Sequence, residues 1–289
     1  TGTAFLGMAT AYLDDMKEHR QHNTVQYKIA ALRRFLSFIG GDFQLERLRA
    51  SQISGYLVAR KQAMGPKAAN RDLVELRAVM NWAIRKRLYH ENPFIPFEKF
   101  PEKKFVRRVP TAAEIDAVLN VATQEQKDFL DILRYTGARL SEVCNLCWRD
   151  VDFQRNTITL WTRKRRGGNL EPGVLAMPQI LLDVLEARKA RPSAHQEYVF
   201  VGRDKRQFTK NSVRLWLPAL CQAAHIQPPF TAHAVRHYFA TLLKDSGVIT
   251  SFQIQAALRH KNLSTTEKYL HDLSIDRGVA ALLDGEGNS

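Results

Sequence analysis

Apolar side chains recur every three or four positions through most of the N-terminal third of the chain. That spacing collects them on one face of a helix and predicts an amphipathic helix wherever it persists. Thr24 and Ser51 are suitable N-caps, and Gly40-Gly41 is a suitable helix end. We therefore expect a small bundle of four helices, which begin near Ala4, Thr24, Ser51 and Lys67 and end near Arg20, Ile39, Leu57 and Leu88.

The stretch NPFIPFEKFPEKKFVRRVPT interrupts this pattern with four prolines, Pro93, Pro96, Pro101 and Pro110. Proline lacks the backbone N–H and its ring disrupts a helix, so this density favours an extended linker. The sequence thus predicts a first domain over residues 1–92, a basic proline-rich linker over 93–110 and a second domain over 111–289.

The second domain is predicted to be mostly helical with one small sheet. TAAE at Thr111 resembles a capping box at a helix start, and helical patterns follow at about 126–135, 179–190, 211–224, 232–245 and 251–259. NTITLW alternates as a strand, RKRRGGN turns the chain, and GVLAMP supplies a return strand. The expected fold class is mainly α, with a small antiparallel β-sheet in the second domain.

Charge adds a functional expectation to this outline. The 289 residues carry a net charge of +14, and residues 1–110 hold 20 Lys and Arg against 10 Asp and Glu. Such an excess indicates a polyanion partner, although a merely solvated basic surface is the alternative. The candidate DNA-binding residues are Arg33, Arg34, Lys67, Arg71, Arg77, Lys103, Lys104, Arg107 and Arg108.

Other classes of protein fit the composition poorly. No apolar run approaches the 18 or more residues that span a bilayer, so no membrane partner is expected. Three cysteines form no disulfide framework and favour a reducing compartment. The expected location is cytoplasmic and nucleoid-associated. Cys144 and Cys147 form a C-x-x-C, but with only Cys221 besides them core packing is favoured over a zinc site, and no metal is expected.

The candidate chemical residues are individually ambiguous. Arg139 and Glu142 lie three apart on one helical face in TGARLSE and could form only a local ion pair. His233 and Arg236 share a helix face in HAVRH for the same reason. Lys164 could be an exposed hairpin tip, and His260 and Tyr269 could each be structural.

The ordered set of all seven resembles the tyrosine recombinases, the phage-integrase family of site-specific DNA recombinases. TGARLSEVCNLCWRDVDF is similar to the family's first arginine block, HAVRHYFATLLKDSG to its histidine–x–x–arginine block, and ALRHKNLSTTEKYLH to the block with its tyrosine nucleophile. The resemblance covers nearly the whole chain. It implies a SAM-like core-binding domain followed by a catalytic domain, and a metal- and ATP-independent reaction without cofactors through a 3′-phosphotyrosyl intermediate.

The chemistry of these side chains agrees with such roles. Two guanidiniums, Arg139 and Arg236, can hold the non-bridging oxygens of a phosphodiester through bidentate bonds. Tyr269 needs a base or a cationic pocket to become a nucleophile, for which His233 and His260 are available. By resemblance Lys164 is the general acid, while Glu142 is expected to orient a neighbouring side chain.

The resemblance also implies partners and leaves rival functions open. We expect double-stranded recombination sites bound by a homotetramer through a Holliday junction, with room for accessory DNA-bending or directionality factors. Arg259 stands where the family commonly has glycine and is a candidate DNA contact. An integrase of a phage or other mobile element is the favoured function; a chromosome-dimer resolvase, a relaxing topoisomerase and a catalytically silent DNA-binding regulator are the alternatives.

Overall fold

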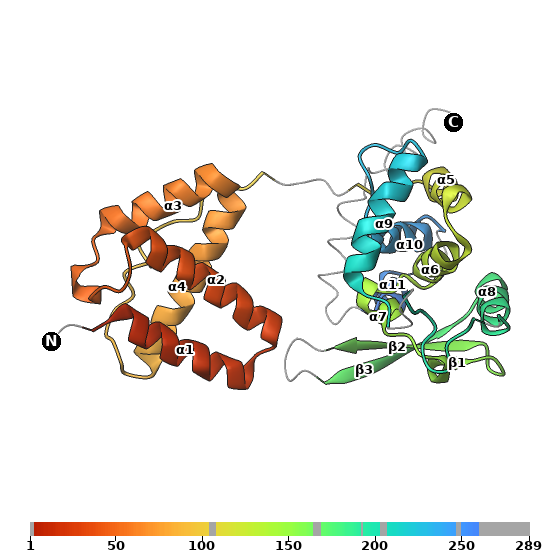
Figure 1. The fold of residues 1–289 in the computed structure, drawn as a ribbon, viewed down its shortest axis with the longest axis horizontal. Helices are drawn as coiled ribbons and strands as arrows, with labels where there is room; N and C mark the ends of the chain where they lie inside the picture. Colours follow the sequence, from red (N-terminus) through yellow and green to blue (C-terminus); the bar gives the residue numbers. More distant parts are fainter. Residues whose placement is uncertain are drawn as a thin grey trace, which may run out of the picture. The chain divides into compact units, whose positions relative to one another are not determined.

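A computed structural model describes residues 3–103, 108–163, 169–191, 193–202, 207–246 and 250–259, with only the backbone of Arg163. These residues form two compact units (Figure 1). Described residues up to 103 belong to the first unit, and those from 108 onward belong to the second. The change of unit therefore falls in the proline-rich segment.

The first unit contains the four expected helices. They are α1 (Phe5–His19), α2 (His22–Ile39), α3 (Ala50–Met64) and α4 (Pro66–Arg85), with a 3₁₀ turn at Leu45–Arg47. Phe5, Phe35 and Leu76 are fully buried in its core. The starts differ slightly from the expectation: α2 begins two residues before Thr24, and α3 is capped by Arg49, whose N–H donates to the Gln52 side chain.

The first part of the proline-rich segment packs on α4 instead of bridging freely. Phe94 is fully buried, and Arg77 donates to the carbonyls of Phe94 (3.0 Å), Ile95 (3.1 Å) and Phe97. Asn70 both accepts from the N–H of Phe100 and donates to its carbonyl, each at 2.8 Å. Buried aromatic side chains and hydrogen-bonded backbone groups therefore hold this part of the segment against α4, although its proline content alone indicated an extended linker.

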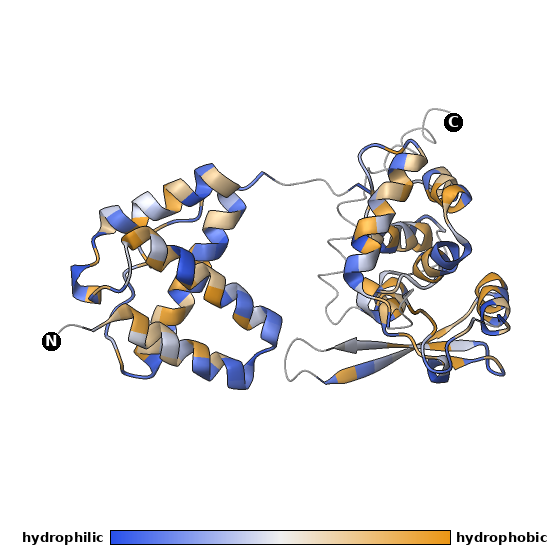
Figure 2. Cartoon of the chain, viewed as in Figure 1, coloured by the Kyte–Doolittle hydropathy of each residue, from blue (hydrophilic) through white to orange (hydrophobic). Residues whose placement is uncertain are grey.

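The second unit is mostly helical. Its helices are α5 (Ala112–Val121), α6 (Gln124–Thr136), α7 (Leu140–Cys144), α8 (Gln179–Lys189), α9 (Lys210–Ala223), α10 (Ala232–Asp245) and α11 (Ser251–Ala257). The capping box at α5 is confirmed, because Thr111 and Glu114 exchange side-chain to backbone bonds. At α7 the sequence analysis placed Arg139 and Glu142 on one helical face but gave no bounds, since five residues are too few to show a period. In Figure 2 apolar and polar residues alternate along the helices of both units.

A three-stranded antiparallel sheet lies beside these helices (Figure 1). Its order is β1 (Val151–Asp152), β2 (Thr157–Arg163) and β3 (Leu170–Ala176), with Leu160 opposite Gly173. Ile158 and Leu160 of β2 are fully buried in the core of the unit. The mainly helical fold with a small antiparallel sheet is confirmed. Among the described residues, no helix has both the length and the apolar character that a membrane crossing requires.

Candidate active site

A buried carboxylate organises the site. Glu142, in the first turn of α7, accepts four hydrogen bonds: from the N–H of Arg139 (2.9 Å), Nη1 of Arg139 (2.8 Å), Oγ1 of Thr162 (2.6 Å) and Nη2 of Arg259 (2.8 Å). These four residues are called the Glu142 cluster below. They come from the start of α7, from β2 and from the second residue after the end of α11.

The cluster keeps Glu142 ionised. Its carboxylate is 1% exposed, and burial by itself would raise its pKa. Attraction to Arg259 and the hydrogen bonds from Thr162 and Arg139 outweigh burial and lower the pKa of Glu142 to about 2. The glutamate is therefore a fixed negative charge that holds guanidiniums in place.

Arg139 is held without being enclosed. Besides its bonds to Glu142, Nη1 donates to Thr162 (3.3 Å) and Nη2 reaches the carbonyl of Arg259 at 3.5 Å. Its side chain is nevertheless 35% exposed. A cation that is oriented from one side and open on another can bind an incoming anion.

Arg236 lies beneath the surface, with 1% of the residue exposed. On α10, it donates through Nη1 to the carbonyl of Gly137 (2.5 Å) and through Nη2 to the carbonyl of Leu258. Gly137 has φ 55°, and a Cβ there would lie 2.3 Å from a ring carbon of Phe239. The glycine of TGAR is thus required both for the backbone conformation and for the close approach of α10.

Three distant sequence blocks meet in this arrangement. The two arginines that the sequence singled out, Arg139 and Arg236, donate to consecutive carbonyls, those of Arg259 and Leu258. These carbonyls immediately precede His260 in the chain. Lys164, His260 and Tyr269 themselves lie outside the described residues.

A second histidine accompanies the expected one. The ring of His233, an exposed residue of α10, meets the ring of His237 edge to face, with centroids 4.7 Å apart. His237 is 5% exposed. The sequence analysis did not single it out, although its position one turn after His233 places both on the same helix face. Thr162 was also missed, because a strand threonine carries no distinctive signal.

The candidate DNA-binding residues divide into two groups. Arg34, Arg77 and Arg259 make intramolecular contacts, with Asp72, with backbone carbonyls and with Glu142 respectively, and Arg108 contacts Glu114 and the carbonyl of Pro228. Arg33, Lys67, Arg71 and Lys103 are exposed, and Arg71 stacks on Tyr27 at 4.0 Å. Lys104 and Arg107 lie outside the described residues, and a DNA contact by any of the set stays a prediction.

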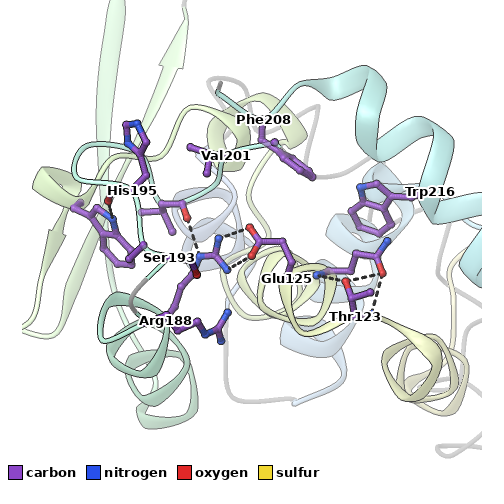
Figure 3. Close-up of a pocket in the computed structure, with 14 residues that line it drawn as sticks. Thr123, Glu125, Arg188, Ser193, His195, Val201, Phe208 and Trp216 are labelled. Atoms are coloured by element: carbon purple, nitrogen blue, oxygen red, sulfur yellow. Dashed lines mark hydrogen bonds and ion pairs between the residues drawn. The ribbon is translucent and has the colours of Figure 1, made fainter. Parts of the chain in front are cut away.

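A separate pocket of about 560 Å³ in the second unit contains none of the candidate catalytic residues (Figure 3). Its lining includes Glu125, Arg188 and Trp216. Arg188 forms ion pairs with Glu125 and with the buried Asp128. The guanidinium of Arg188 is therefore engaged within the fold, and the Glu142 cluster is the better candidate for chemistry.

The described residues offer little for a metal. They contain no group of three or more His, Cys, Asp or Glu side chains placed to hold one. Cys144, Cys147 and Cys221 are each buried as free thiols, and burial raises the pKa of Cys144 to about 11. A protonated thiol is a poor metal ligand, so this environment suits core packing.

Comparison with known proteins gives a consistent picture. Residues 108–274 match the Phage integrase family. The chain is 31% identical over 267 residues to tyrosine recombinase XerA of Thermococcus kodakarensis, which covers 89% of this chain and 87% of that protein. It is 26% identical over 278 residues to a tyrosine recombinase of Thermosipho africanus, with 91% and 93% covered.

Solved structures share the fold. A lambda integrase dimer bound to a COC′ core site superposes with a TM-score of 0.76 at 17% identity, covering 95% of this chain and 98% of that one. The Tn1549 transposon integrase in complex with transposon right end DNA gives 0.74 at 20% identity, covering 91% and 94%. A lambda integrase tetramer bound to a Holliday junction gives 0.73 at 17% identity, covering 93% and 78%.

Proposed function

This chain belongs to the phage integrase family and is a tyrosine-type site-specific DNA recombinase, and we propose that the Glu142 cluster and Arg236 hold the phosphodiester that it cuts and rejoins. The convergence of Arg139 and Arg236 on the backbone next to His260 carries this proposal. Two guanidiniums near one point can bind two non-bridging oxygens of a phosphate and stabilise the charge that develops there.

The proposed reaction is a transesterification. The Tyr269 oxygen attacks phosphorus, forming a 3′-phosphotyrosyl bond while the bond to the 5′-oxygen breaks. A histidine, His233 or His260, accepts the phenolic proton, and Lys164 donates a proton to the leaving 5′-oxygen. The phosphodiester energy stays in the new bond, so the reverse attack by a 5′-hydroxyl religates DNA without ATP.

Access to Arg236 is part of the proposal. Arg139 is open to solvent on one side, whereas Arg236 is 1% exposed. We therefore propose that neighbouring side chains rearrange when DNA binds and that this rearrangement uncovers Arg236. Fixed bonds to the carbonyls of Gly137 and Leu258 would preserve its orientation during that change.

The cellular role is proposed to be integration or excision of a phage or other mobile element by four protomers on two DNA sites. Solved relatives of the same fold include a transposon integrase on its DNA and a lambda integrase tetramer on a Holliday junction. The second candidate is resolution of chromosome dimers, the alternative that the sequence analysis left open. The two candidate roles are distinguished by where the DNA site isolated in the experiment below lies, inside a mobile element or in the chromosome alone.

The test is a covalent trap. Sheared DNA from the source organism is incubated with the wild-type chain or Tyr269→Phe in EDTA, denatured in detergent, and the DNA that stays attached to protein is sequenced. A nicked duplex carrying the recovered site then serves as a suicide substrate. We expect an adduct with the wild type only.

Two results would contradict the proposal. An adduct that survives Tyr269→Phe would place the nucleophile elsewhere. Failure of the wild type to form any adduct on DNA that it demonstrably binds would instead support the catalytically silent DNA-binding regulator.

A further inference from the structure

Arg259 occupies a position that ordinarily suits glycine. It follows the end of α11 with φ 54°, in the left-handed region that costs a residue with a Cβ. Its side chain is 9% exposed, and its Nε is buried with no hydrogen-bond partner among the described residues. Both features are unfavourable, so the position calls for a compensating interaction.

A glycine on the neighbouring strand accommodates this side chain. A Cβ built on Gly173 of β3 would lie 2.2 Å from Cδ and 3.1 Å from Cγ of Arg259. The φ of Gly173 is not in the left-handed region, so its own backbone does not require glycine. Glycine inside a strand is unfavourable unless something approaches the backbone closely, and here Arg259 does so.

The compensating interaction is with Glu142. Nη2 of Arg259 bonds to Oε2 of the carboxylate at 2.8 Å, while Arg139 and Thr162 share Oε1. Arg259 thus shares Oε2 with the backbone N–H of Arg139, while Oε1 directs Nη1 of Arg139. The same residue's carbonyl lies 3.5 Å from Nη2 of Arg139. Arg139 is therefore positioned by both the side chain and the backbone of Arg259.

We propose that Arg259 is a positioning residue for recombination, which orients Arg139 through Glu142, and that Gly173 is the strand position that admits its side chain. The inference rests on the proposed role of Arg139 in holding the phosphodiester. It assigns Arg259 a function inside the active site in place of the DNA contact expected from the sequence.

The test measures single-turnover cleavage of the nicked suicide duplex at pH 7 by the wild type, Arg259→Gly, Arg259→Lys, Gly173→Ala and the Arg259→Gly/Gly173→Ala double variant. Arg259→Gly relieves the backbone strain yet is expected to slow cleavage by about tenfold, because a lost supporting contact misorients Arg139. Gly173→Ala is expected to slow the wild type similarly and to have no further effect in the Arg259→Gly background. Arg155→Gln, an exposed charge in the turn before β2, is the control and keeps the wild-type rate.

The pH dependence separates positioning from a general loss of stability. Among the described residues, the titratable groups that contact Glu142 are Arg139, at the start of α7, and Arg259, after α11; β2 contributes the neutral Thr162. Without Arg259, Glu142 takes up a proton at higher pH. The ratio of the Arg259→Gly rate to the wild-type rate is expected to fall further as the pH is lowered from 7 toward 4.5, the ordinary pKa of the glutamate, whereas Arg259→Lys, which keeps the charge, holds its ratio constant.

The outcomes are distinct. Wild-type cleavage by Arg259→Gly across this pH range, or equal effects of Gly173→Ala in both backgrounds, overturns the inference and leaves the proposed function standing. A wild-type chain that forms no adduct overturns the proposed function and this inference with it.

Discussion

Each unit of the molecule contains a buried carboxylate that binds two arginines and a hydroxyl group. In the first unit Asp72 of α4 accepts from Arg34 of α2 and from Arg60 and Tyr56 of α3. In the second, Glu142 accepts from Arg139, Arg259 and Thr162. The two carboxylate side chains are 2% and 1% exposed. The two units therefore contain the same set of groups: one buried carboxylate, two arginines and one hydroxyl.

The geometry of the bonds distinguishes them. Arg34 meets Asp72 with two nitrogens, Nε at 3.0 Å and Nη2 at 2.5 Å, so one edge of its fork is fully used. The guanidinium of Arg139 gives the side chain of Glu142 one nitrogen only, Nη1, while its Nη2 donates to the carbonyl of Arg259. A bidentate pair consumes the guanidinium edge that would bind an anion, whereas a single contact orients the cation and leaves donors available. The Asp72 network suits a clamp between helices, and the Glu142 cluster suits a binding site.

The largest expected effect is the loss of the clamp. Asp72→Asn leaves two guanidiniums without a counter-charge, and we expect the free energy of unfolding of the full chain to fall by about 3 kcal/mol. Urea unfolding measures this loss. Asp14→Asn, at an exposed pair with Lys17, is the control and should cost under about 0.5 kcal/mol. Equal losses of unfolding free energy in the two variants would show that the buried Asp72 network contributes no more to stability than an exposed ion pair.

Glu142→Gln tests the other side of the comparison. It should lower stability by about 2 kcal/mol and slow cleavage of the suicide duplex by roughly 100-fold, because Arg139 loses the charge that orients it. Rate and stability are measured on the same preparation, with the exposed Glu186→Gln of α8 as the control. A stability loss with an unchanged cleavage rate would reduce the cluster to a second structural clamp.

Acid should narrow the difference in stability between the wild type and Glu142→Gln. The folded pKa of Glu142 is about 2, below its ordinary 4.5, so the ionised carboxylate stabilises the fold fully above the ordinary value. That stabilisation is lost as pH falls from about 4.5 toward 2. Thermal unfolding midpoints of the two proteins, compared at pH 6 and pH 3, should converge in acid. A gap that persists unchanged would mean that the charge contributes nothing.

The smallest effects come from the two hydroxyl groups. Tyr56→Phe and Thr162→Val each remove one donor to a carboxylate, at 2.8 Å and 2.6 Å, and should each cost about 1 kcal/mol. Only Thr162→Val should also slow cleavage, by several-fold, because Thr162 contacts Arg139 as well. Each variant is the control for the other in paired unfolding and cleavage assays. Slower cleavage by Tyr56→Phe as well would remove the distinction between clamp and site.

Much of the fold could be predicted because its signals are local. Periodicity located the helices of the first unit, and the TAAE capping box located α5. Helix α7, with five residues, is too short for its bounds to be predicted from a period, and strand β1, with two residues, was missed. The proline-rich segment was predicted to be a linker, but Arg77 and Asn70 bind its backbone to α4. Those contacts span up to 30 residues and leave no local pattern.

The chemistry of the site divides along the same line. The sequence by itself determined the residue types and their order, from Arg139 and Glu142 through His233 and Arg236, because each pair lies within a short contiguous motif. Only the tertiary structure decided how they are used. It brings Arg259 to Glu142 across 117 positions and Thr162 across 20, and it opens room for Arg259 at Gly173. Hydrogen bonds and close packing depend on distances in space, which helix ends and strand register set and which the order of residues does not display.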